Sequence, residues 1–566
     1  MKGFFSFKKG VSIALAASML VMGACGSSDT SSADAGSEAD TNSASETVES
    51  TETEESAESE VSQEPEADTS RATTADGGQY DKVTVGLQDD PSDLSTTGFG
   101  AYSYMIVAPN FYETLFDLRD NDYTPILAKG YTEVDDLHWD VELYDYITDT
   151  NGNNITADDV VFSFNLLIDS GKAARYDYFE SVEAVDTYTV RFTWSKPIDA
   201  IGALEWPWCR TYIVSQKSYE EGNFTEAPAG TGPYDVTEYV VGSHLTLTAK
   251  DNYWQTDELR DELHKANVKT IEYDVIAETS QHVIGLGTDQ IQYSQYVPAE
   301  NIADFEENGQ YADGHAVYIT QGSALEVLMA NNSEGKITAD PNFRKAIWYA
   351  IDNEAVATAT GTYLASYALG TPFFADYYES WESAENNYMA SMDVDKAKEY
   401  LDQTAYAGET LVIMGASDEA SKSAMTMIQA LLTNVGINVE IKAEDGVMLE
   451  EDMLDPTTWD ILYKDCGGGS QVGEWNRFTN YNEFGTGYNM SFIKDDTLQS
   501  VYETANSLDG HTEENMTAFH DYVLENGYYY AVCSPKINAV YADCFATLAF
   551  AEGEFFRPGA CEFYLD

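Results

Sequence analysis

Two short segments of the chain place aromatic rings beside an arginine. Trp206, Trp208 and Arg210 form the first segment, and Trp475 and Arg477 form the second. A guanidinium group suits a planar carboxylate, and an indole ring stacks on side chains or on sugars, so both segments are candidates for contact with a small solute. Packing of the tryptophans in a core and surface ion pairs of the arginines are the structural alternatives.

An acidic residue and a run of glycines follow the β-prone stretch 459–463. Asp465 would suit an ammonium group if its carboxylate were desolvated and hydrogen-bonded, although a solvated aspartate gives the same pattern. Gly467 and Gly468 belong to three consecutive glycines, which allow close backbone approach to a ligand or simply form a flexible loop. Tyr488 is a further aromatic candidate.

Signatures of catalysis and of metal binding are missing from the sequence. The seven histidines are scattered, and the chain has no His-Glu-x-x-His, no Cys-x-x-Cys, no Gly-x-Ser-x-Gly and no phosphate-binding loop. With 98 acidic residues, a pair of carboxylates arises by chance and does not indicate a glycosidase. We therefore expect no enzymatic activity, no cofactor and no dedicated metal site.

Charge divides the chain into three parts. Residues 1–25 carry +3, residues 26–80 carry −14 and residues 81–566 carry −58, which together give −69. This balance argues against nucleic acid as a partner, because nucleic-acid binding needs a basic surface. The acidic body either keeps an exported protein soluble or attracts cationic ligands. An apolar fraction of 43% over 566 residues indicates a folded body of several lobes.

The first 24 residues have the pattern of an export signal. Three lysines precede an apolar run of 13 residues, which is shorter than the ~20 residues that span a bilayer. The run ends in residues 22–27, which resemble a bacterial lipobox with Cys25 as the lipidated residue; an ordinary secretory signal is the alternative. Residues 25–80 are rich in Ser, Thr and acids and poor in large apolar residues, which predicts a disordered tether.

Hydrophobic periodicity predicts mixed α and β structure beyond residue 80. Residues 82–87 and 188–194 read as strands. An amphipathic helix is expected to begin after Thr156, which has an acid three residues later. A helix over residues 424–435 leads through a glycine into the alternating stretch 437–441, which is the unit of an α/β lobe.

Eight segments occur in a characteristic order along this body. They are residues 111–116, 125–128, 155–164, 230–234, 250–254, 343–352, 393–401 and 434–439. In this order they resemble the bacterial extracellular solute-binding proteins of family 5, the peptide-binding group that serves ABC importers. Most of these segments are expected to be structural; in residues 230–234, Gly230 and Gly232 are expected at turns with positive φ.

The resemblance implies an α/β fold of the periplasmic-binding-protein type II, in its three-domain peptide-binding variant, with a hinge and an interlobe cleft. Domain I is expected at 81–112, 230–315 and 526–566, domain II at 113–229 and domain III at 316–525. Residues 206–210 would then lie where domain II approaches the cleft.

The resemblance also implies capture without chemistry. A solute binds between two lobes, the hinge closes, and the closed form meets the permease and ATPase subunits of an ABC importer. We expect a monomeric lipoprotein on the extracellular face of a Gram-positive cell membrane, with a peptide as its solute. An oligosaccharide, an amino-acid conjugate or a nickel complex are alternatives of the same class, and an exported hydrolase is a distant one.

The sequence departs from the peptide-binding pattern at one position. In that pattern the ammonium-binding aspartate lies about nine residues beyond the strand aspartate, which is Asp460 here, so the position falls on Gly469. Asp465 is the nearest acid, and whether it replaces the family residue is open. Cys533 and Cys544 could pair if they lie on adjacent strands.

Overall fold

The computed structural model describes most of the chain beyond residue 70. The described residues are 71–98, 102–119, 122–173, 176, 178–256, 259–260, 262–374, 376–466, 475–476, 478–479, 489–551 and 555–565. The predicted signal and tether, including Cys25, lie outside them. Among the described residues, no helix combines the length and the apolar character needed to cross a bilayer.

A 12-stranded sheet, in the order β16-β15-β17-β13-β18-β11-β1-β10-β9-β8, organises the body, and β12 and β14 also pair with β18. Its strands are β1 (Tyr80–Leu87), β8 (Tyr234–Val240), β9 (His244–Ala249), β10 (Val268–Val275), β11 (Tyr293–Ser294), β12 (His315–Gln321), β13 (Leu325–Ala330), β14 (Tyr363–Ala365), β15 (Thr410–Ala416), β16 (Asn438–Glu444), β17 (Ile461–Cys466) and β18 (Tyr529–Ala542).

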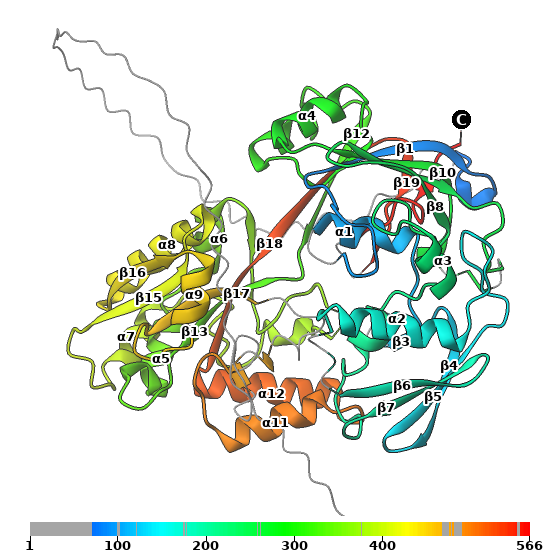
Figure 1. The fold of residues 1–566 in the computed structure, drawn as a ribbon. Coiled ribbons are helices and arrows are strands. Elements are labelled where there is room, and N and C mark those ends of the chain that lie inside the picture. Colours follow the sequence, from blue (N-terminus) through cyan, green and yellow to red (C-terminus); the bar gives the residue numbers. More distant parts are fainter. Residues whose placement is uncertain are drawn as a thin grey trace, which may run out of the picture. The chain divides into compact units, whose positions relative to one another are not determined.

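Strand β18 belongs to two parts of this sheet at once (Figure 1). Its first half pairs with β13, and its second half, from Lys536 to Ala542, pairs with β12. Between the halves, the N–H of Gly322 donates to the carbonyl of Pro535 at 2.7 Å. One continuous strand therefore connects two hydrophobic cores through backbone hydrogen bonds.

The first core gathers around β1 and β8 to β10, where β1 runs parallel to β10. Helix α1 (Tyr102–Val107) and the C-terminal segment supply further buried aromatic residues to it.

Several short elements lie between the larger ones along the described residues. They are α3 (Gln216–Glu221), α4 (Thr279–Gly287), β19 (Phe545–Thr547), β20 (Phe550–Ala551), β21 (Phe555–Phe556), β22 (Glu562–Phe563), and the 3₁₀ turns η1 (Thr74–Asp76), η2 (Ala108–Asn110), η4 (Glu262–His264), η5 (Ala299–Asp304), η6 (Ile337–Ala339) and η7 (Glu379–Trp381).

The second core lies between a four-stranded antiparallel sheet, in the order β4-β5-β7-β6, and helix α2. Alternate residues of β7 are buried, as the predicted strand requires, and Thr156 and Asp159 form the predicted capping box at the start of α2. The elements are β2 (Phe116–Arg119), β3 (Asp122–Pro125), β4 (Ala128–Asp135), β5 (His138–Leu143), α2 (Ala157–Asp169), β6 (Phe179–Asp186), β7 (Thr189–Trp194) and the π-helical turn η3 (Glu205–Cys209).

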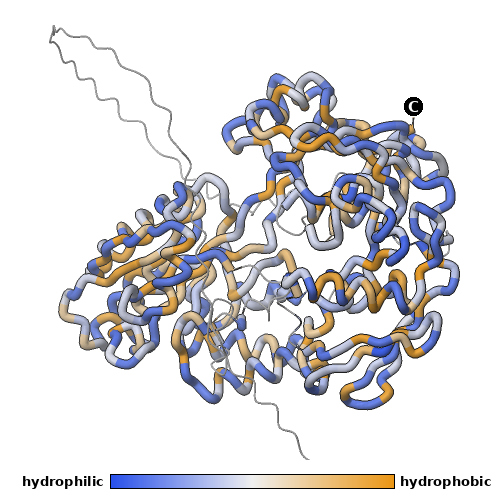
Figure 2. Tube along the Cα trace, in the orientation of Figure 1, coloured by the Kyte–Doolittle hydropathy of each residue, from blue (hydrophilic) through white to orange (hydrophobic). Residues whose placement is uncertain are grey.

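The third core is an α/β unit built on parallel strands β15 and β16 with α8 as the crossover helix. Helix α8 ends at Gly436, whose φ of 95° suits a glycine, and Figure 2 shows its hydrophobic positions interleaved with hydrophilic ones. The helices are α5 (Pro341–Trp348), α6 (Asn353–Thr360), α7 (Val394–Leu401), α8 (Glu419–Val435), α9 (Gly446–Asp452), α11 (Asp496–Asn506) and α12 (Glu513–Asn526).

The two cysteines considered for pairing belong to different cores. Cys533 is buried in the third core, whereas Cys544 packs against the first core. Both are free thiols in the structure. The pairing that the sequence left open is therefore not formed in this structure.

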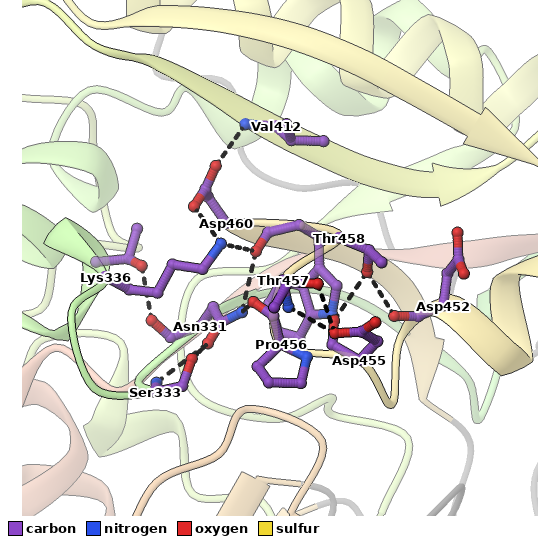
Figure 3. A network of polar contacts seen from close by, with 12 residues as sticks. Asn331, Ser333, Lys336, Val412, Asp452, Asp455, Pro456, Thr457, Thr458 and Asp460 are labelled. Atoms are coloured by element: carbon purple, nitrogen blue, oxygen red, sulfur yellow. Dashed lines mark hydrogen bonds and ion pairs between the residues drawn. The ribbon is translucent and has the colours of Figure 1, made fainter.

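Asp460 lies directly before β17, at the end of this strand opposite to Asp465. One carboxylate oxygen accepts from Lys336 Nζ at 2.8 Å, and the other accepts from the N–H of Val412 at 2.8 Å (Figure 3). Asn331 Nδ2 donates to the carbonyls of Pro456 and Trp459 in the same network. This aspartate therefore ties β17 to β15.

A buried carboxylate joins the first and second cores. Glu113 is almost fully buried, and its carboxylate accepts hydrogen bonds from the Tyr253 hydroxyl, from Trp254 Nε1 at 2.7 Å and from Gln255 Nε2 at 3.3 Å. Burial raises the pKa of this carboxyl. The Glu113 side chain thus connects residues 111–116 with residues 250–254, two of the eight segments that resemble the family.

The prediction of positive φ at Gly230 and Gly232 is wrong, because neither is among the described glycines with positive φ. A Cβ atom on Gly230 would lie 1.7 Å from the carbonyl oxygen of Phe111, and one on Gly232 would lie 2.7 Å from the carbonyl carbon of Phe111. These positions need glycine because the backbones approach closely, not because the chain turns.

We predict that Gly232→Ala lowers the stability by ~1–3 kcal/mol, because the added methyl group meets backbone atoms that cannot move independently. Urea denaturation of the purified protein measures this loss. Gly446→Ala is the matched control, since a Cβ atom there meets nothing within 4 Å. Equal stability of the two variants would contradict the close-approach explanation.

Candidate ligand-binding site

Two cavities among the described residues combine charged groups from separate segments. The cavity that we call the acidic cavity is lined by Glu326, Tyr363, Ala416, Asp418, Ser421, Leu449, Tyr463, Lys464 and Asp465. The one that we call the arginine cavity is lined by Met105, Pro109, Tyr112, Glu113, Thr114, Asp117, Leu118, Arg119, Cys209, Arg210, Tyr212, Leu263, His264, Ala551, Phe555 and Arg557.

The acidic cavity lies at the carboxyl ends of the parallel strands β15 and β17, which is where open α/β sheets bind ligands. Asp418 follows β15 and caps α8 by accepting from the N–H of Ser421 at 2.9 Å. Glu326 lies on β13 directly opposite Asp465 of β17. The sheet topology therefore brings three carboxyl groups together, two from the neighbouring strands β13 and β17 and one from the turn after β15.

Glu326 is the most deeply buried acid of this cavity, with 5% of the residue exposed. Its Oε1 accepts from the Tyr363 hydroxyl at 3.1 Å. The pKa of its carboxyl is raised to about 7, mainly by desolvation and also by the nearby Asp465 and Asp418, while hydrogen bonds from Tyr363 and Tyr463 oppose the shift. A cation entering the cavity would stabilise the ionised carboxylate.

A lysine partly balances the acids at the rim. Lys464 Nζ lies 3.2 Å from a carboxylate oxygen of Glu450 and 3.4 Å from one of Asp465, whose side chain is 67% exposed. The lysine side chain is largely buried while both acids are exposed, and ion pairs with exposed partners contribute little stability. Asp465 is thus an outer acid and Glu326 an inner acid of the same cavity.

The arginine cavity lies where the first core meets the second, next to Glu113. It contains about 800 Å³ of empty space, part of which is open to solvent. Arg119 pairs with Asp117 at 2.8 Å, and Arg210 pairs with Glu205 at 3.1 Å. The sequence left open whether Arg210 forms an ion pair or contacts a ligand. The structure shows the ion pair with Glu205, and the Arg210 side chain also lines the cavity.

The predicted tryptophans take structural positions where they are described. Trp208 is fully buried in the second core and stacks on Phe116 at 4.7 Å between ring centroids. Trp475 is 1% exposed in the third core and stacks on Phe519 at 4.3 Å. Trp206 is half-buried in η3. We do not include Trp208 and Trp475 in the proposed site, because their rings are occupied by core packing.

Five of the predicted positions lie outside the described residues: Gly467, Gly468, Arg477, Tyr488 and the lipidation residue Cys25. Asp465 and Arg210 are described, and they line the acidic and the arginine cavity respectively. The sequence interpretation missed Glu326, Asp418, Arg119 and Arg557. Only Glu326 carried a local signal, as a lone acid within the otherwise apolar strand β13.

The comparisons with known proteins agree on one family. The family model described as bacterial extracellular solute-binding proteins, family 5 (middle region), matches residues 122–487. The glutathione-binding protein GsiB of Escherichia coli O1:K1 is 24% identical over 372 residues, covering 63% of this chain and 67% of that protein. The nickel-binding protein NikA of Staphylococcus aureus is 24% identical over 416 residues, covering 71% and 79%.

A structural neighbour supports the same fold. The oligopeptide-binding protein AppA of Bacillus subtilis, solved in complex with a nonapeptide, superposes with a TM-score of 0.61 at 17% identity, covering 86% of this chain and 99% of that one. At this identity the likeness establishes the fold alone. The fold class predicted from the sequence is thereby confirmed, whereas the domain boundaries stay a prediction.

We predict that Glu326→Gln changes the pH dependence of stability. A carboxyl whose folded pKa is about 7 stabilises the fold when protonated, and that contribution is lost as the pH rises from about 4.5 through 7. The stability of the wild type relative to the variant should fall by up to about 3 kcal/mol between pH 4.5 and pH 8.

Urea denaturation at several pH values measures this difference. Glu440→Gln, at an exposed position of β16, controls for the loss of a carboxylate from the same sheet. A difference between wild type and Glu326→Gln that stays constant with pH would show that Glu326 is not held in an unfavourable environment.

Proposed function

Because the chain belongs to family 5 of the bacterial extracellular solute-binding proteins and is the substrate-binding component of an ABC importer, we propose that it captures a short peptide with a free amino group. The amino group would enter the acidic cavity, with Glu326 as its inner partner and Asp465 as its outer partner. The captured peptide is then delivered to the permease of the importer.

One observation carries the peptide assignment, namely the buried carboxyl group of Glu326 at the carboxyl ends of β15 and β17. Desolvated acids are unfavourable unless they are paired and hydrogen-bonded. The Tyr363 hydroxyl supplies a hydrogen bond, and the ammonium group of a solute would supply a positive charge beside Glu326. Glu326 would thus serve in place of the family aspartate whose position falls on Gly469.

The way in which the lobes meet supports capture by closure. The N–H of Ile201, in the loop before η3, donates to the carbonyl of Asn506 at the end of α11 at 2.8 Å. The Ile201 side chain packs against the third core. A loop of the second core thus contacts the third core directly, while β18 connects the first core to the third. Bending at Gly322 and Pro535 would open this contact.

The names of the relatives leave room for other solutes. GsiB is named for glutathione and NikA for nickel, and AppA was solved with a nonapeptide. The described residues contain no group of three or more His, Cys, Asp or Glu side chains arranged to hold a metal ion. We favour the peptide because the acidic cavity provides a site for its amino group.

We also propose how the protein works at the cell surface. It acts as a binding protein and not as an enzyme, and it works as a monomer. Cys25 carries the lipid that anchors it to the extracellular face of the membrane, and residues beyond Cys25 form the tether. The permease and ATPase subunits of the importer are its partners.

We predict that a mixture of peptides of two to five residues raises the melting temperature of the purified full-length protein, and that N-acetylation of the same peptides abolishes the shift. Acetylation removes the positive charge that Glu326 would neutralise. Differential scanning fluorimetry measures both effects. Equal shifts with free and acetylated peptides would contradict the role of the acidic cavity, and a shift with maltodextrins alone would contradict the peptide assignment.

A further inference from the structure

We propose that the acidic cavity exchanges a proton for the ammonium group of the solute, so that capture releases a proton and weakens as the medium becomes acidic. This inference rests on the proposed function, because it concerns the same cavity and the same amino group. It adds the group that gives up the proton, which is the Glu326 carboxyl. The affinity of the protein for its solute is then set by the pH of the medium.

Glu326 is surrounded by groups from every strand that packs against β13. Asp465 on β17 and Cys533 on β18 are its partners in the two ladders, and the Tyr363 hydroxyl on β14 donates to its Oε1 at 3.1 Å. The titratable groups that face its carboxyl are Tyr463 and Asp465 on β17, Cys533 on β18, Tyr363 on β14 and Asp418 after β15. All of these groups are acids, phenols or a thiol, and each is neutral or negative in its ordinary protonation states.

One lysine lines the described part of this cavity, and its ion pairs lie at the rim. Lys464 Nζ lies 3.2 Å from Glu450 and 3.4 Å from Asp465, and neither pair includes Glu326. The inner carboxyl is therefore hydrogen-bonded, but this lysine does not neutralise it. A buried carboxylate in such a position is relieved in two ways, namely by taking up a proton or by pairing with a cation from solution.

Four of the surrounding groups keep one protonation state near neutral pH. Burial raises the pKa of Tyr363, Tyr463 and Cys533, so these three stay protonated. Burial also acts to raise the pKa of Asp418, but hydrogen bonds at the start of α8 outweigh it, and this carboxyl stays ionised. Glu326 differs from them, because its pKa of about 7 lies at neutral pH. Its proton is therefore the one that an entering ammonium group would displace.

The exchange predicts that affinity is highest at a pH of about 7.5. Below this pH Glu326 is protonated, and above it the amino group of the peptide, with an ordinary pKa of about 8, loses its own proton. From these two pKa values, peptides of two to five residues with uncharged side chains should bind about 20-fold more weakly at pH 5.5 than at pH 7.5. Isothermal titration calorimetry on the purified full-length protein measures both affinities.

Proton release distinguishes this exchange from a general effect of pH on the fold. Titration at pH 6 in two buffers with different ionisation enthalpies counts the protons, and we expect about one released per bound peptide, because Glu326 is mostly protonated there. Glu326→Gln should abolish both the proton release and the weakening in acid. Equal affinity of the wild type at pH 5.5 and pH 7.5, or binding at pH 6 without proton release, would overturn the proposal.

Two further variants keep the test decisive if Glu326→Gln binds too weakly or fails to fold. Asp465→Asn removes a carboxylate that raises the pKa of Glu326, so the weakening in acid should move to lower pH without disappearing. Glu440→Gln, at its exposed position on β16, is the matched control and should keep the wild-type profile. An unchanged profile in Asp465→Asn, or loss of the pH dependence in Glu440→Gln, would contradict the assignment of Glu326.

A cation without a peptide backbone separates this inference from the proposed function. Ethylammonium chloride, compared with tetramethylammonium chloride at equal ionic strength, should raise the melting temperature of the wild type at pH 7.5 but not at pH 5.5, because it donates hydrogen bonds to an ionised Glu326. If peptides fail to bind but this effect is present, the peptide assignment falls and the proton exchange stands. If peptides fail to bind and ethylammonium acts equally at both pH values, or not at all, the proton exchange is wrong as well.

Discussion

The backbone ladder of β18 is the constraint on which the rest of this structure depends. A strand of 14 residues cannot bend freely along its length, because its hydrogen bonds to β12 and β13 fix its course in two cores. The short interval around Pro535 and Gly322 is where the two ladders meet. Under the proposed capture by closure, bending between the cores would take place at this interval.

The two cavities differ in how their charges are maintained. In the acidic cavity, the sheet registers Glu326 opposite Asp465, and burial makes the inner carboxyl unfavourable in the absence of a cation. In the arginine cavity, charges from three distant segments meet where Glu113 joins the first and second cores. The acidic cavity thus holds an unfavourable carboxyl group that a cation would stabilise, whereas the arginines of the other cavity already pair with Asp117 and Glu205.

The sequence predicted local structure well and long-range proximity poorly. The capping box at Thr156, the glycine stop at Gly436 and the alternation along β7 are local patterns, and each has the predicted form. Glu326 and Asp418 come together only because β13 and β15 join one sheet, which periodicity does not specify. For the same reason the sequence left open whether Trp208 lines the cleft or packs in a core, and the structure shows several rings of the second core around it.

The family resemblance supplied what periodicity could not, namely the fold class and the cleft, but its physical interpretation needed correction at Gly230 and Gly232. Close approach to Phe111, rather than positive φ, requires those glycines. The resemblance also left the ammonium partner open at Gly469, and the partner proposed here comes from a different strand, β13. The family pattern thus directed attention to the segment after β17, and the structure adds Glu326 to the proposed site.

Native mass spectrometry of the protein isolated from its own cells, with fragmentation of whatever it retains, tests the central claim most directly. A ligand buried between closing lobes survives purification, so its mass can be read from the intact complex. We predict a series of retained masses that fragment into amino-acid residues and carry a free amino group. Retained masses separated by hexose units, or a nickel complex without a peptide, would contradict the account.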